Sequence, residues 1–145
     1  MQSENVNHKA INDTYKNAHI ALQSINDIMP SVDDRDLRNE LKSQQEGYQS
    51  VIDEISDYMK ENGIEMKDIG FMQKAMLWGS IKMKTIMDDS KNQIAELMIK
   101  GTVTGINELT AMKNECENYD EKVCEYVEKL LRLEEEYEQR LKKYL

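Results

Sequence analysis

Apolar residues recur at alternating intervals of four and three positions through most of this 145-residue chain, which contains a single proline. That spacing places apolar side chains on one face of an α-helix. The chain is 39% hydrophobic and 32% charged, with a mean hydropathy of -0.75, which is typical of a protein built from long helices. The composition argues against a β-sandwich, a barrel or a Rossmann fold, and the length suits a single domain.

The first predicted helix ends at Pro30, because proline cannot continue the helical hydrogen bonds and restricts the residue before it. Its apolar face carries Ile11, Tyr15, Ala18, Leu22, Ile25 and Met29. Ser31 or Asp33 is expected to cap a second helix, with Asp34 and Asp36 in its first turn.

The second predicted helix ends at Asn62 and Gly63, residues that accept a left-handed conformation. Its seam, interrupted only at Gln44, comprises Leu37, Leu41, Gln44, Tyr48, Val51, Ile55 and Tyr58. Because the loop between the two helices is short, residues 1–63 are predicted to form an antiparallel hairpin.

Residues 64–89 are predicted to form a helical crossover that covers the bundle, roughly 39 Å long if fully helical. The segment is rich in large apolar side chains: Met66, Phe71, Met72, Met76, Trp78, Met83 and Met87. Methionine-rich surfaces adapt to partners, so this segment is the candidate interface of a homodimer or of an unknown protein partner. The alternative is a plain up-down bundle in which residues 64–87 continue into the next helix without a break.

Residues 90–145 are predicted to form a second hairpin. The third helix places Ile94, Leu97 or Met98, Ile106, Leu109 and Met112 on one face and frays near Asn118. Asp120 is the expected cap of the fourth helix. The seam of this last helix comprises Val123, Val127, Leu130, Glu134, Tyr137 and Leu141.

Three segments resemble small, uncharacterised bacterial ferritin-like proteins. They are Asn17-Ala-His-Ile-Ala-Leu-Gln-Ser-Ile25, residues 90–102 (Ser-Lys-Asn-Gln-Ile-Ala-Glu-Leu-Met-Ile-Lys-Gly-Thr) and residues 134–144 (Glu-Glu-Glu-Tyr-Glu-Gln-Arg-Leu-Lys-Lys-Tyr). The resemblance implies an all-α, ferritin-like four-helix bundle of two antiparallel hairpins joined by a crossover around a central polar layer.

A standard di-iron centre of that superfamily needs a Glu-x-x-His motif on each of two helices. The only histidines are His8 and His19, and Asn5 and Lys16 stand three positions before them. We therefore expect no standard di-iron site and no cofactor. A carboxylate-only or mononuclear metal site remains an open alternative.

Four residues are predicted to form a polar layer in the middle of the bundle: His19, Gln44, Tyr48 and Glu134. Glu134 is the most informative of them, since a carboxylate on a core seam is costly without a partner. Thr102, Thr104, Tyr48 or Gln44 is its expected hydrogen-bond donor. Alternatively, Glu134 lies near an open end of the bundle or snorkels between helices, leaving Leu130 and Leu133 to fill the core. Gly101 and Gly105 are predicted to let their helix approach Ala18 and Ala21 closely.

The net charge of -9 argues against nucleic acid and anionic membranes as partners, and no phosphate-binding loop or catalytic motif occurs. The predicted function is that of a noncatalytic structural or interaction protein. The alternative is a metal-binding or redox protein with a nonstandard carboxylate site at Glu134, Gln44 and Tyr48, with His19 or Glu96.

Cys116 and Cys124 are the only cysteines. They lack metal-binding spacing, so two free thiols are expected. The first eight residues lack the features of a secretory signal, and no apolar run reaches the roughly 20 residues needed to cross a bilayer. We therefore expect a cytoplasmic protein.

Overall fold

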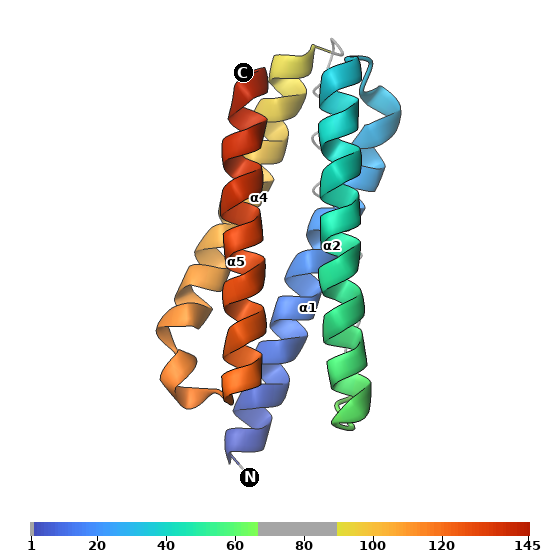
Figure 1. The fold of residues 1–145 in the computed structure, drawn as a ribbon. Helices are drawn as coiled ribbons and strands as arrows, with labels where there is room; N and C mark the ends of the chain where they lie inside the picture. The colour runs from blue at the N-terminus through green and yellow to red at the C-terminus, as the bar shows by residue number, and fades with distance from the viewer. Residues whose placement is uncertain (1, 67–89) are drawn as a thin grey trace.

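The computed structural model describes residues 2–66 and 90–145, and these form four long helices with no strand among them (Figure 1). The long helices are α1 (Gln2–Ile28), α2 (Arg35–Glu61), α4 (Lys91–Asn114) and α5 (Glu121–Leu141). Three short 3-10 helices follow α1, α4 and α5: η1 (Met29–Ser31), η2 (Cys116–Asn118) and η3 (Lys142–Tyr144). The predicted all-α class is confirmed for this part of the chain.

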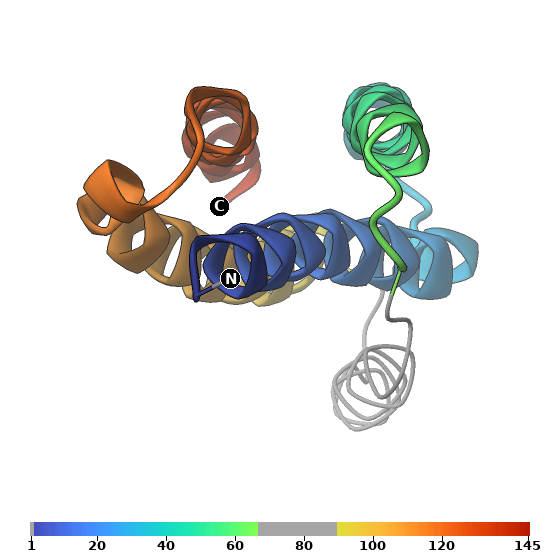
Figure 2. The same cartoon turned by 90° about the horizontal axis from the view of Figure 1, so that it is seen from below.

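The long helices pair as two antiparallel hairpins, α1 with α2 and α4 with α5 (Figure 1). Figure 2, which looks along the bundle, shows α1 and α4 crossing in one layer beneath α2 and α5. Helix α2 ends at one end of the bundle, and α4 begins at the other. None of the described helices is long and apolar enough to cross a membrane.

The third predicted helix begins at Lys91, preceded by Ser90 in an extended conformation. A helix that runs on without a break from residues 64–87 is therefore not formed. Most of the predicted crossover, 67–89, lies outside the described residues, and so does its methionine-rich candidate interface apart from Met66, which is 37% exposed.

The cap of α2 is Asp34, so the prediction of Ser31 or Asp33 was wrong. The Asp34 side chain accepts a hydrogen bond of 2.8 Å from the Leu37 N–H. The reason is that Pro30 lies in the 3-10 turn η1, closed by the Val32 N–H on the Met29 carbonyl at 3.1 Å, which delays the start of the helix. At the other end, Gly63 adopts a φ of 63° as predicted.

The predicted seams form most of the core. Every seam residue of α5 is buried, as are all of those of α2 except Tyr58, which is half-buried beside the buried Met59. Helix α1 buries a second row of small and polar residues one position before its apolar seam: Ala10, Thr14, Asn17 and Ser24. This second row was not predicted, and it supplies a residue of the site described below.

The two cysteines form a disulfide, Cys116 to Cys124, so the expectation of free thiols was wrong. Helix α4 ends at Asn114, and the tight turn of η2 returns the chain onto the first turns of α5. This turn brings the two Cα atoms to 5.5 Å, which is within the usual range for a disulfide. Spacing along the sequence did not reveal the pairing because the turn shape decides it.

Candidate ligand-binding cavity

A cavity of about 310 Å³ lies between the helices in the middle of the bundle. All four long helices contribute to its wall. The lining residues are Asn17, Ile20, Ala21, Ser24 and Ile25 of α1, Gln44 and Tyr48 of α2, Met98, Gly101, Thr102, Thr104, Gly105 and Glu108 of α4, and Glu134 of α5. The volume is at the lower end of the range of small-molecule sites.

Glu134 lies on the wall of this cavity with only 1% of its surface exposed. Its Oε1 atom is buried and accepts no hydrogen bond from any described residue. Burial raises the pKa of Glu134 well above its ordinary 4.5, and the nearby Glu108 carboxylate raises it further. An unpartnered acid in such a place holds its proton more tightly than one in water.

Two of the donors expected for Glu134, Thr102 and Thr104, bond elsewhere. The Thr102 hydroxyl donates to the Met98 carbonyl at 2.8 Å within α4, and the Thr104 hydroxyl donates to Lys100 in the same way at 3.0 Å. The alternative, in which Glu134 lies near an open end of the bundle, is wrong, because only 1% of its surface is exposed and it lines a cavity to which all four long helices contribute.

Gly105 faces the Glu134 carboxyl group directly. A Cβ atom at this position would lie 2.5 Å from Glu134 Oε1, closer than real contacts allow. The glycine therefore makes room for a side chain of α5, where the sequence had predicted close contact with Ala18 and Ala21. An open cavity remains at this level, which the expected close packing would have filled.

Asn17 joins the same group from α1. Its Nδ2 donates a 3.2 Å hydrogen bond to the Gly105 carbonyl, which fixes the orientation of the amide because the opposite orientation would set two acceptors against each other. The Asn17 Oδ1 atom is buried and accepts no hydrogen bond from a described residue. A Cβ atom on Gly105 would lie 3.4 Å from Asn17 Oδ1. The unpartnered oxygens of Glu134 and Asn17 therefore both lie close to Gly105.

Gln44 and Tyr48 occupy the wall on the side of α2. Gln44 is buried and donates from Nε2 to Glu40 Oε2 at 3.0 Å. Tyr48 is buried with its ring edge-on to Tyr137, the centroids 5.3 Å apart. Burial raises the pKa of Tyr48 well above its ordinary 10.0, and the charge of Glu134 raises it further. The Tyr48 phenol therefore stays protonated.

His19 is not part of the cavity wall, so the structure brings together three of the four predicted residues. The imidazole is half-buried and packs on the Tyr15 ring at 4.5 Å, and burial lowers its pKa from 6.5. The side chain of Gln45 donates to Asn26 at 2.7 Å, so this part of α2 lies closer to the end of α1 than predicted. The turn η1 places more residues between α1 and α2 than the tight loop that the prediction assumed, so a given residue of α2 faces a later residue of α1.

Asn17 lines the cavity but was not among the predicted residues. It lies in the second buried row of α1, and the spacing of that row was visible in the sequence. Small and polar residues recur there with the same four-three spacing as the apolar seam. That row comprises Ala10, Thr14, Asn17, Ala21 and Ser24. Besides its hairpin partner α2, helix α1 also contacts α4 and α5, so it buries a second row of residues.

The electrostatics of the cavity are one-sided. Among the described residues that line it, Glu108 and Glu134 are acidic and none is basic. The apolar part of the wall comes from Ile20, Ile25 and Met98. The cavity is therefore suited to an apolar group that carries positive charge or hydrogen-bond donors.

Among the described residues, neighbouring His, Cys, Asp and Glu ligand atoms gather away from the cavity. Among the described residues, no group of three His, Cys, Asp or Glu ligand atoms close enough to share an ion includes Glu134. Glu96 is exposed and pairs with Lys100 at 3.5 Å. The one group of three that the described residues do form is Cys116, Cys124 and Glu128, in the turn between α4 and α5.

Comparison of the chain with protein-family models, with curated proteins and with solved structures finds no match. The function must therefore be inferred from the cavity itself.

Proposed function

We propose that this protein is a noncatalytic binding protein whose cavity holds a small amphipathic cation, an apolar group ending in a protonated amine. The observation that carries the proposal is the Glu134 carboxyl group, buried in the cavity wall with an oxygen that no described residue satisfies. A buried polar atom without a partner costs about 1–3 kcal/mol. A ligand that supplies the missing donor recovers that free energy on binding.

An ammonium group fits this wall better than a neutral or anionic head group. It brings three donors and no acceptor, which match the unpartnered oxygens of Glu134 and Asn17. A carboxylate ligand would instead meet the acidic Glu134 and Glu108. The overall charge of -9 also attracts cations over a longer range.

The proposal gives the cavity a binding role and no chemistry. The hydroxyl groups of Thr102 and Thr104 donate to the backbone of their own helix, and His19 lies outside the cavity wall. Neither threonine hydroxyl is therefore activated by a base, which nucleophilic catalysis requires.

We also propose that the fold is of the ferritin-like type without the di-iron ligands. Three observations support this proposal. The helices form two antiparallel hairpins, and α2 ends at one end of the bundle while α4 begins at the other (Figure 1). Polar side chains lie at the centre. The homodimer through the methionine-rich segment stays a prediction, to be tested by the mass of the protein in solution.

The test is calorimetric titration of the full chain with hexylamine, hexanol and hexanoate, which share one apolar group and differ in head-group charge. Hexylamine is expected to bind, and the other two to bind at least tenfold more weakly. Glu134→Gln should weaken hexylamine binding at least tenfold, which is about 1.4 kcal/mol. The exposed neighbour supplies the control, Glu135→Gln, which should bind like the wild type.

Proton release provides a second readout. Because free Glu134 holds its proton above the ordinary range, pairing with an ammonium ion should expel that proton into the buffer. Binding heats should then differ between buffers of different ionisation enthalpy, and this difference should vanish in Glu134→Gln. Equal binding of the amine and the alcohol, or unchanged binding by Glu134→Gln, would overturn the proposal.

A further inference from the structure

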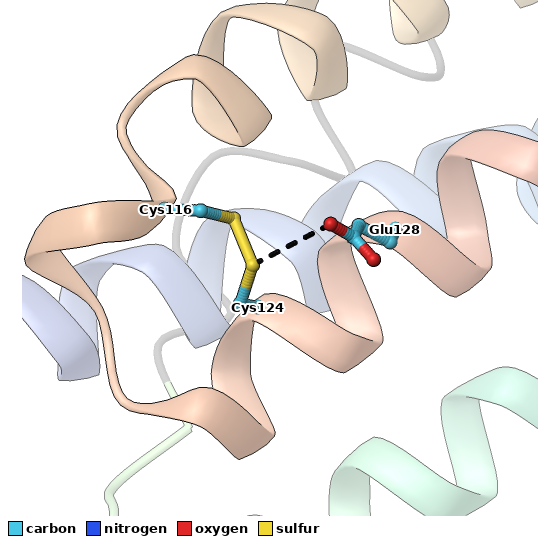
Figure 3. A group of neighbouring side chains, drawn as sticks. All are labelled: Cys116, Cys124 and Glu128. Carbon is cyan, nitrogen blue, oxygen red and sulfur yellow. Dashed lines mark hydrogen bonds between the residues drawn. A yellow bond between two sulfur atoms is a disulfide. The ribbon is translucent and has the colours of Figure 1, made fainter.

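A second group of chemically reactive side chains lies in the turn between α4 and α5 (Figure 3). Cys116 lies in η2, Cys124 in the first turns of α5, and Glu128 one helical turn further along α5. One ligand atom from each, two sulfurs and a carboxylate oxygen, lies within 4.8 Å of the other two. All three side chains are half-buried.

This donor set matches the preferences of zinc. Zn²⁺ binds thiolate sulfur at about 2.3 Å and carboxylate oxygen at about 2.0–2.2 Å, and three protein ligands leave a fourth position for water. Cys124 and Glu128 are four residues apart on one helix, so they share a face, as paired metal ligands on helices do. Cys124 Sγ already lies 3.8 Å from Glu128 Oε1 (Figure 3).

The turn is held by contacts that do not depend on the sulfur atoms. The backbone N–H of Asp120 donates to Asn7 Oδ1 of α1 at 2.6 Å, and the N–H of Tyr119 donates to the Cys116 carbonyl at 3.0 Å. The second carboxylate oxygen of Glu128 accepts from Arg132 at 3.4 Å, which orients the carboxylate from outside. Breaking the disulfide therefore leaves the two cysteines close together.

The disulfide and a metal ion exclude each other, because zinc needs both sulfurs as thiolates. We propose that the reduced chain binds one Zn²⁺ through Cys116, Cys124 and Glu128, and that oxidation of the two thiolates by a small-molecule disulfide, which is itself reduced to two thiolates, restores the Cys116–Cys124 bond and expels the ion. In the reducing step a small dithiol attacks the disulfide; the Cys116–Cys124 bond breaks, the dithiol closes to its own disulfide, and its two hydrogens pass to the cysteines. Zinc then displaces the two thiol protons into solvent.

The test compares the full chain in its two redox states. The protein is reduced with a dithiol, desalted without oxygen and titrated with Zn²⁺ against a chromophoric chelator, alongside the untreated disulfide form. One zinc per chain is expected in the reduced form and none in the oxidised form. Titration with Co²⁺ should give a thiolate-to-metal charge-transfer absorption in the reduced form only.

Substitutions identify the ligands. Cys116→Ser and Cys124→Ser should each weaken zinc binding by at least a hundredfold, and Glu128→Gln by at least tenfold. The matched control is Glu125→Gln, an exposed residue of the same helix that lies outside the group, which should bind like the wild type. Circular dichroism of each reduced variant checks that the helices remain.

Three results would overturn the proposal. The first is the absence of retained zinc in the reduced wild type with its helices intact. The second is equal retention by the variant that lacks both cysteines, which would place the metal elsewhere. The third is unchanged affinity in Glu128→Gln, which would remove the carboxylate from the ligand set. None of these results bears on amine binding at Glu134, so the two proposals fail separately.

Discussion

Replacing Glu134 with glutamine should change how the stability of the protein depends on pH. In the unfolded chain this carboxyl group titrates near its ordinary 4.5, whereas in the folded protein its pKa is raised by burial and by Glu108. Below the unfolded value both states carry the proton, and the group costs nothing. Above the folded value the cavity must hold an ionised carboxylate, and the full penalty is present.

The penalty from this group therefore lowers the free energy of unfolding of the wild type as pH rises between those two values. One proton gives a slope of about 1.4 kcal/mol per pH unit in this window, and each unit of pKa shift adds about 1.4 kcal/mol to the final penalty. Glutamine has nearly the same shape and does not titrate. Glu134→Gln should therefore become progressively more stable than the wild type as pH rises, until the difference levels off.

The assay is urea denaturation followed by circular dichroism, at steps from about pH 5 to pH 8. The informative quantity is the difference between the wild type and the variant, since carboxyl groups that do not interact with Glu134 titrate equally in both. Glu135→Gln, at the exposed neighbouring position, should give a difference that stays flat. A flat difference for Glu134→Gln as well would refute the reasoning, because it would mean that the carboxyl group titrates normally in the fold.

The remaining predictions concern single contacts. Asp34→Ala should lower the free energy of unfolding by about 0.5–2 kcal/mol through loss of the helix cap, while Asp33→Ala should change it by less than about 0.5 kcal/mol, both measured by urea denaturation. Asn17→Ala should cost about 1 kcal/mol through loss of its hydrogen bond to the Gly105 carbonyl; no change in the urea midpoint would contradict that role. Gly105→Ala should destabilise the wild type by about 1–3 kcal/mol through overpacking, yet stabilise a Glu134→Ala background by about 1 kcal/mol through helix propensity; equal effects in the two backgrounds would show that the alanine and the carboxyl group do not collide.

The cavity illustrates which parts of a site can be predicted. Gln44 and Glu134 were predicted because each interrupts an apolar seam with a polar group, and Tyr48 because it lies on the same seam as Gln44. Position on the seam alone implies burial. His19 was grouped with them by an assumed alignment of the first two helices, and the extra turn at Met29–Ser31 shifted that alignment. Their hydrogen-bond partners could not be predicted, because a threonine on a helix can satisfy its hydroxyl on its own backbone.

The sequence by itself determined the class of fold and the four described helices. Apolar spacing, the single proline and the helix end at Gly63 are local features, and their structural consequences depend only on the backbone around them. The seam of the last helix, from Val123 to Leu141, is buried residue for residue as predicted. Only the tertiary structure decided what faces Glu134. The two unpartnered oxygens beside Gly105 come from α1 and α5, more than a hundred residues apart in the chain, and the pairing of Cys116 with Cys124 depends on the shape of a turn. Such contacts depend on how helices cross, and the crossing is set by packing across the whole bundle rather than by any one segment.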